Sequence, residues 1–211
     1  MAITTYAELQ SAIGDWLAKS NLTARAPDFI ALAEVEINDL LRTADMETRA
    51  TASTVAGEAY LAVPENFAGA RRMIVKGTTA RPLESVTPQY IDRRYLDAAR
   101  GQPRVYAVED NQFRFGPTPD TAYTLEVSYF RKVPALSDVN TTNWLLSSHP
   151  SVYLFGALKE AAPFLMDDAR IQIWETKFQS ALSRLQIADR FDRFPGPYAM
   201  KHDYGTDDRR P

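Results

Sequence analysis

Hydrophobic residues recur with a helical period at both ends of this sequence and with a period of two between them. Residues 1–45 and 136–191 carry apolar side chains three or four positions apart, which predicts amphipathic helices. Residues 46–135 contain short runs in which apolar and polar residues alternate, as they do in half-buried strands. We therefore predict an α+β fold, in which a helical body of about four main helices carries an inserted antiparallel β-rich region and ends in an extended C-terminal tail over residues 192–211.

Capping signals place the first two helices. Thr5 and Glu8 have the spacing of a capping box, in which the threonine hydroxyl and the glutamate carboxylate each accept a backbone hydrogen bond. Pro27 and Asp28 suit the first turn of a second helix. We expect these helices to run to about residues 19 and 42 and to form a hairpin.

Two further helices are predicted after the β-rich region. Residues 150–166 carry charge only at Lys159 and Glu160, so this helix is expected to be central or shared with a neighbouring subunit. Asp167 and Asp168 begin a longer helix, and the apolar surface of the two helices together favours oligomerisation. The apolar residues of the longer helix form a seam for packing along another helix: Ile171, Trp174, Phe178, Ala181, Leu185 and Ala188.

The β-rich region contains several strand candidates. The clearest covers residues 123–129, where large apolar residues alternate with polar ones. Residues 103–108 and 112–115 flank the turn sequence 109–111 and are predicted to form a hairpin. Thr87 suits the N-cap of a short helix within this region.

The residue types needed for enzymatic chemistry are scarce. The chain contains no cysteine and only two histidines, which excludes disulfides, thiolate nucleophiles and cysteine-containing metal sites. It also lacks a glycine-rich phosphate loop, a dinucleotide fingerprint and a zinc-protease motif. His149 precedes Pro150, where we expect a helix entry rather than a catalytic base. We predict that the protein is not an enzyme and uses no cofactor.

Acidic residues are the remaining candidates for catalysis. Adjacent side chains point to different sides of a helix or strand, so neighbouring acids rarely converge on one substrate. Glu34 and Glu36 lie on one predicted helix and are expected on its solvated face. Three acid pairs are interpreted as a helix cap, a solvated tail and a hairpin turn, respectively: Asp167-Asp168, Asp207-Asp208 and Glu109-Asp110.

Charge limits the kinds of partner. The 24 basic and 27 acidic residues give a formal net charge of -3, without the basic surplus on which non-specific DNA binding relies. Arginine pairs occur at Arg71-Arg72, Arg93-Arg94 and Arg209-Arg210. A guanidinium group suits ion pairs between subunits or contacts with a DNA backbone, and simple solvent exposure is the third alternative.

The sequence contains no segment typical of a membrane protein or a signal peptide. The first residues lack a basic and an apolar region, and the uncharged window 139–158 is too polar to span a bilayer. We expect synthesis in the cytoplasm and no membrane partner.

Aromatic residues spaced along the C-terminal tail are candidate partner-binding anchors. A segment without periodicity that keeps large rings beside proline and glycine is typical of chains that become ordered on a partner. A flexible end with incidental aromatics is the alternative. The candidate anchors, together with the terminal arginine pair, are Phe191, Phe194, Tyr198, Tyr204, Arg209 and Arg210.

Several short segments resemble the head–tail adaptor proteins of tailed bacteriophages. The resemblance covers about residues 5 to 185 and rests on many short similarities without a catalytic motif. It is carried by Thr5-Tyr6-Ala7-Glu8-Leu9-Gln10, Asp15-Trp16-Leu17, Pro27-Asp28-Phe29-Ile30, Met46-Glu47-Thr48-Arg49-Ala50, Tyr60-Leu61-Ala62-Val63-Pro64, Asn143-Trp144-Leu145-Leu146, residues 153–163 and Asp167-Asp168-Ala169-Arg170.

The resemblance implies a structural virion protein of the neck, made in the bacterial host cytoplasm. Such adaptors form a ring, usually of twelve subunits, beneath the portal protein. They join the head to a downstream tail or nozzle protein and line the channel through which double-stranded DNA leaves. A helical body, a β-rich portion facing the next tail component and a terminal segment reaching toward the portal or a neighbour are the implied fold.

The sequence is also compatible with two other functions. One is a different neck or tail module, such as a stopper or tail-terminating subunit, that uses the β-rich region as its working face. The other is a virion-associated wall hydrolase that uses carboxylates such as Asp167 or Glu109, for which the acid pairs are the only motivation.

Overall fold

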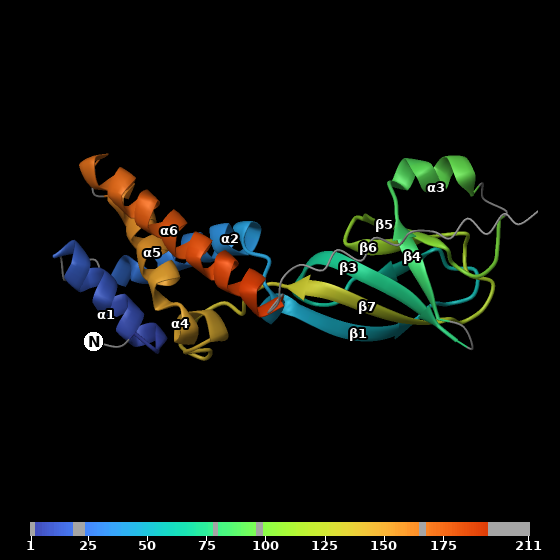
Figure 1. Ribbon diagram of the computed structural model, residues 1–211, viewed down its shortest axis with the longest axis horizontal. Coiled ribbons are helices and arrows are strands. Elements are labelled where there is room, and N and C mark those ends of the chain that lie inside the picture. Colours follow the sequence, from blue (N-terminus) through green and yellow to red (C-terminus); the bar gives the residue numbers. More distant parts are fainter. Residues whose placement is uncertain (1–2, 19–23, 78–79, 96–98, 165–167, 194–211) are drawn as a thin grey trace, which may run out of the picture.

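The computed structural model describes residues 3–18, 24–77, 80–95, 99–164 and 168–193. The molecule is elongated, with helices at one end and a curled sheet at the other (Figure 1). We call these parts the helical unit and the β unit. The combination confirms the predicted α+β class.

The helical unit is built around one central helix, as the sequence predicts for the apolar segment after residue 150. Helix α5 contacts each of the other four helices of this unit. It is apolar over most of its circumference, which explains its central position. The helices are α1 (Tyr6–Leu17), α2 (Ala26–Leu40), α4 (Trp144–Ser148), α5 (Pro150–Phe164) and α6 (Asp168–Arg193).

The predicted capping box of α1 is confirmed. The Thr5 hydroxyl accepts from the Glu8 backbone N–H at 3.3 Å, and the Glu8 carboxylate accepts from the Thr5 backbone N–H at 3.0 Å. Hydrogen bonds from the backbone and hydroxyl groups of Thr4 and Thr5 lower the pKa of Glu8 to about 2. Helix α2 has proline in its first turn, also as predicted.

Helix α4 is absent from the sequence prediction. It spans five residues, too few to show a helical period. Its start is fixed by Asn143, whose side-chain oxygen accepts from the Leu146 backbone N–H at 2.8 Å. His149 ends this short helix and directly precedes α5, which confirms its predicted place at a helix entry.

The described residues of the β unit form one seven-stranded sheet with the order β1-β7-β3-β4-β5-β6-β2. The hairpin predicted around residues 109–111 is formed by β5 and β6. A short helix, α3 (Pro88–Arg94), covers the sheet at the end far from the helical unit (Figure 1). The strands are β1 (Glu47–Ser53), β2 (Tyr60–Ala62), β3 (Phe67–Lys76), β4 (Arg81–Ser85), β5 (Val105–Glu109), β6 (Gln112–Gly116) and β7 (Thr124–Arg131).

The prediction of a purely antiparallel region is wrong at one pair of strands. Strands β4 and β5 run parallel, with Glu84 opposite Val105 and Ser85 opposite Tyr106. Parallel neighbours need a crossover connection, and the segment that contains α3 supplies it. The sheet is therefore mixed.

Each unit has its own apolar core. In the helical unit, buried residues of α1, α2, α5 and α6 form one cluster. In the β unit, one face of the sheet buries alternate residues of the strands, including Met73, Val75, Leu125 and Val127. The opposite face of strands β1, β7 and β3 is polar, as expected from the alternation in residues 123–129.

The predicted seam of α6 packs inside the subunit. Trp174 and Phe178 are buried against α5, and the Trp174 ring stacks on Phe155 at 6.2 Å between ring centroids. Ala188, the last predicted seam residue, is exposed. Since α5 and the seam bury their apolar surfaces within one chain, these two faces no longer argue for oligomerisation.

Candidate partner-binding surfaces

A group of charged side chains joins the two units. Glu47 begins β1 and pairs with both Arg71 of β3 and Arg193 of the last turn of α6. Arg193 also donates to Asp189 at 2.7 Å, and the Asp189 carboxylate accepts from the backbone N–H of Ala44. We call Glu47, Arg71, Asp189 and Arg193 the clasp. It fixes the C-terminal end of α6 to the first residue of the sheet.

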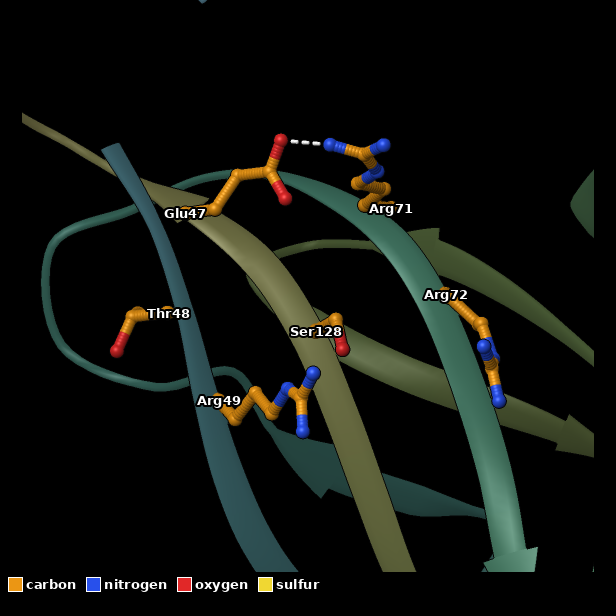
Figure 2. A pocket seen from close by; sticks show the side chains of 6 residues that line it. All are labelled: Glu47, Thr48, Arg49, Arg71, Arg72 and Ser128. Atoms are coloured by element: carbon orange, nitrogen blue, oxygen red, sulfur yellow. Dashed lines mark ion pairs between the residues drawn. The ribbon is translucent and has the colours of Figure 1, made fainter. Parts of the chain in front are cut away.

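A cationic row crosses the polar face of the sheet beside the clasp. Arg49 on β1 and Arg72 on β3 both lie opposite Ser128 of the intervening strand β7. These side chains line a cavity of about 370 Å³ together with Glu47, Thr48 and Arg71. Figure 2 shows Arg49 extending from β1 toward β7 and the ion pair between Glu47 and Arg71.

A β-bulge explains why both members of the pair Arg71-Arg72 line this cavity. Neighbouring residues of a regular strand point to opposite faces. The register between β3 and β7 shifts between Ala70 and Arg72, so Arg71 is the extra residue. The extra residue interrupts the alternation, and Arg71 joins the clasp while Arg72 lies in the cationic row.

The electrostatics of this face follow from its excess of cations. Lys76 contacts Glu126 at 2.7 Å. The hydrogen bond and charge of Lys76, with the more distant charges of Arg49 and Arg72, hold the pKa of Glu126 below its usual value. Within the described part of the chain, Arg49 and Arg72 form no ion pair of their own. They are therefore available to a carboxylate or a phosphate.

A second cavity shares Arg71 with the first and is also basic. It has a volume of about 460 Å³, and Leu40 and Phe130 supply part of its wall. Its lining includes four arginines, namely Arg42, Arg71, Arg190 and Arg193, with Asp189 as the acidic lining residue. The region where the two units meet thus presents guanidinium groups in two cavities.

One predicted tail anchor lies in a helix instead. Helix α6 continues to Arg193, so Phe191 lies in its last turn, and residues 192 and 193, predicted to begin the tail, are helical. The sequence after residue 188 is rich in aromatic and charged residues and shows no apolar period, so it did not predict this continuation of the helix. The Phe191 side chain is 71 % exposed, which keeps it available to a partner. Phe194, Tyr198, Tyr204, Arg209 and Arg210 lie outside the described residues.

The prediction that Glu34 lies on the solvated face of its helix is wrong. Its side chain is buried and accepts a hydrogen bond from the Leu136 backbone N–H at 2.8 Å and one from the Tyr153 hydroxyl at 3.3 Å. Asn143 donates to the same tyrosine oxygen at 2.7 Å. Burial raises the pKa of Glu34 and that of Tyr153. This network attaches the segment before α4 to α2 and α5, so it is structural.

Glu36, predicted on the same solvated face, is only partly exposed and makes an ion pair. Lys159 of the central helix pairs with Glu36 of α2, and its Nζ lies 3.3 Å from Glu175 of α6. Burial lowers the pKa of Lys159, but the hydrogen bonds and charges of these two acids outweigh burial, so the pKa is raised. Lys159 therefore connects α2, α5 and α6.

The structure brings no catalytic group together in the described residues. Glu109 ends β5, and Asp110 lies in the hairpin turn, as predicted. Asp168 begins α6, while Asp167 and the pair Asp207-Asp208 lie outside the described residues. Among the residues that can be placed, no cluster of three metal-ligating side chains occurs. No helix in the described ranges has the length and hydropathy needed to cross a bilayer.

Comparison with known proteins identifies the family. Residues 4–201 match the family model of the SU10 adaptor protein. This chain belongs to that family of phage adaptors. The resemblance drawn from the short sequence segments is thereby confirmed, and the adaptor is a structural phage protein of the virion neck. A comparison with curated protein sequences finds no match.

Proposed function

We propose that this adaptor forms a ring of twelve subunits that joins the portal to the tail around the DNA exit channel. The match of residues 4–201 to the adaptor family carries the proposal. The elongated shape supports it, because the helical unit and the β unit lie far enough apart to contact different neighbours (Figure 1).

The charge distribution supports a channel through which DNA moves. The net charge of -3 per chain provides no general attraction for phosphates, so a ring of such chains surrounds DNA without retaining it. The cationic row of Arg49 and Arg72 offers a local, transient contact with the backbone of passing duplex DNA.

Electron microscopy of the virion neck tests this assignment. We expect a ring of this chain directly on the portal, with one of its two units directed toward the tail. A position in a layer that does not touch the portal would favour a stopper or tail-terminating subunit. A position outside the neck would overturn both assignments.

We also propose that the C-terminal segment of the chain docks on the portal, on a neighbouring subunit or on the phage tail. The aromatic residues Phe194, Tyr198 and Tyr204 are its anchors, Arg209 and Arg210 add charged contacts, and Phe191 extends the surface on α6. Truncation after Arg193 should leave a folded subunit with weaker docking. Equal portal binding by the truncated and full chains would show that the tail is passive.

Catalysis plays no part in this proposal. A peptidoglycan zymogram is expected to show no cleared band for the purified chain. A cleared band that disappears with Glu109→Gln would support the hydrolase alternative instead.

A further inference from the structure

Helix α2 carries an exposed stripe opposite its buried face. The stripe consists of Asp28, Leu32, Val35 and Asp39, which follow one another at steps of four, three and four and so lie on one side of the helix. Leu32 is 54 % and Val35 is 62 % exposed. We call these four residues the acidic stripe. It combines two apolar side chains with an acid at each end.

Helix α6 carries a stripe of the opposite charge. It consists of Ile173, Lys177, Arg184, Ile187 and Phe191, which follow one another at steps of four, seven, three and four and so lie on one side of the helix. Ile173 and Ile187 are each about half exposed, at 52 % and 53 %. We call these five residues the basic stripe. It lies roughly a third of a turn around the same helix from the buried residues Phe178 and Leu185.

The two stripes lie on different flanks of the helical unit. Val35 and Asp39 border a surface cavity beside Lys132. On α6, Glu175 and Gln186 face α2, through Lys159 and the backbone oxygen of Leu40 respectively. The basic stripe is therefore turned away from α2.

Lys177 marks the flank on which the basic stripe lies. Its Nζ is 5.7 Å from the centroid of the Phe155 ring, and that ring contacts Trp16 of α1 at 5.9 Å between centroids. The basic stripe thus borders the α1 side. One subunit can present both stripes to two neighbours at once.

Among the described residues, the charged side chains of both stripes make few ion pairs within the subunit. Arg184 donates to the backbone oxygen of Ser180 at 3.3 Å and makes no ion pair with a described residue. Asp39 likewise makes no ion pair with any residue of the described ranges. Asp28 contacts Arg25 at 3.4 Å, but both side chains are more than 60 % exposed, so this pair is weak.

We propose, on the basis of the ring function above, that the acidic stripe of one copy packs against the basic stripe of the next. Apolar side chains on both helices supply the contact area, and two acids meet two cations. Two copies of the same stripe would bring like charges together. The contact is therefore heterologous, the type that closes into a ring when the rotation between subunits fits.

Engineered cysteines provide a direct test, because the natural chain has none. Chains carrying both Val35→Cys and Ile187→Cys, assembled on the portal and treated with a bismaleimide, should give a ladder of covalent oligomers. Each single variant, assembled and treated in the same way, should give only the uncrosslinked chain on a denaturing gel. A control chain with Val35→Cys and Val108→Cys, whose second site is an exposed residue of the β unit, should give no ladder.

The outcomes separate this inference from the proposed function. A covalent dimer from Val35→Cys alone would indicate symmetric pairing and overturn the heterologous contact. A ring on the portal without a ladder would overturn this interface while leaving the adaptor ring intact. Absence of any ring by electron microscopy would overturn the proposed function itself.

Charge exchange gives an independent test of the same contact. Asp28→Lys with Asp39→Lys should lower ring yield at least tenfold, and Lys177→Glu with Arg184→Glu should do the same. All four substitutions together should restore the ring, because the charges are complementary again. Failure to restore it in a chain with unchanged far-UV circular dichroism would contradict the pairing.

Discussion

The helical unit and the β unit bury their apolar surface in different ways. Helix α5 is enclosed by other helices, and even the carboxylate of Glu34 lies inside this unit with its hydrogen bonds formed. The three strands β1, β7 and β3 bury one face and leave the other covered with Arg49, Arg72, Lys76 and Glu126. The helical unit is closed around its centre, whereas the sheet is one-sided.

This difference indicates how each unit meets its neighbours. Contacts of the helical unit depend on the apolar and charged stripes on the outside of its helices. Contacts of the sheet depend on charge spread over its polar face. Salt should therefore weaken contacts of the sheet face more than contacts of the helical unit, since exposed charges are screened and apolar contacts are not.

The largest stability effect is expected in the helical core. Trp174→Ala should lower the free energy of unfolding by about 3–5 kcal/mol, because the ring is buried and stacked on Phe155. Phe191→Ala, an aromatic control on the exposed side of the same helix, should change it by less than about 0.5 kcal/mol. Urea denaturation of the monomeric chain measures both. Equal effects would mean that Trp174 is not buried.

The sheet should show a similar contrast between its two faces. Leu125→Ala should cost about 2–5 kcal/mol, since this side chain is fully buried in the sheet core. Its neighbour Thr124 is exposed on the polar face, and Thr124→Ala should cost less than about 1 kcal/mol. Thermal unfolding of the two variants compares the faces. A large effect at Thr124 would contradict a one-sided sheet.

A smaller effect is expected from the buried carboxylate of the helical unit. Glu34→Ala removes the acceptor for the Leu136 N–H and the Tyr153 hydroxyl and should cost about 1–3 kcal/mol. Glu34→Gln keeps an acceptor oxygen and serves as the matched control. Chemical denaturation at neutral pH should rank the alanine variant below the glutamine variant.

The same carboxylate predicts a pH dependence. Burial raises the pKa of Glu34 in the folded chain above its value in the unfolded chain. Its contribution to stability is therefore fully present below the unfolded pKa and is lost as the pH rises through the folded pKa. Glu34→Gln should gain stability relative to the natural chain as the pH rises from acid to neutral. A constant difference across this range would contradict the burial of a titrating carboxyl.

The smallest effect is expected at the first helix. Thr5→Ala should cost about 1 kcal/mol through loss of the N-cap hydrogen bond. The pKa of Glu8 is lowered to about 2 from 4.5, so its contribution is present above pH 4.5 and is lost as the pH falls toward 2. Glu8→Gln should remove this acid sensitivity. Thermal melts at two acidic pH values provide the measurement.

Local signals in the sequence explain the parts of the fold that were predicted correctly. The capping box, the helix entry at His149 and the hairpin turn at Asp110 each depend on residues close together in the chain. The parallel pair β4–β5 and the burial of Glu34 depend on partners far away. Leu136 lies 102 positions from Glu34, and no periodicity reports such a contact.

The candidate surfaces were predictable only in part. The pair Arg71-Arg72 stands out in the sequence, but the register shift that places both side chains at one cavity does not. Arg49 joins them through strand pairing. Phe191 was predicted to be an aromatic anchor, while the continuation of α6 beyond it was missed because the apolar period of the seam ends before it.

The clasp has a mechanical consequence. Arg193 is the last described residue of α6, and its side chain is bound to Glu47 and Asp189 at the point where the backbone continues toward the C-terminus. A partner that pulls on the segment after Arg193 loads these ion pairs before it loads either apolar core. We therefore expect tension on this segment to open the joint between the two units while both cores stay folded.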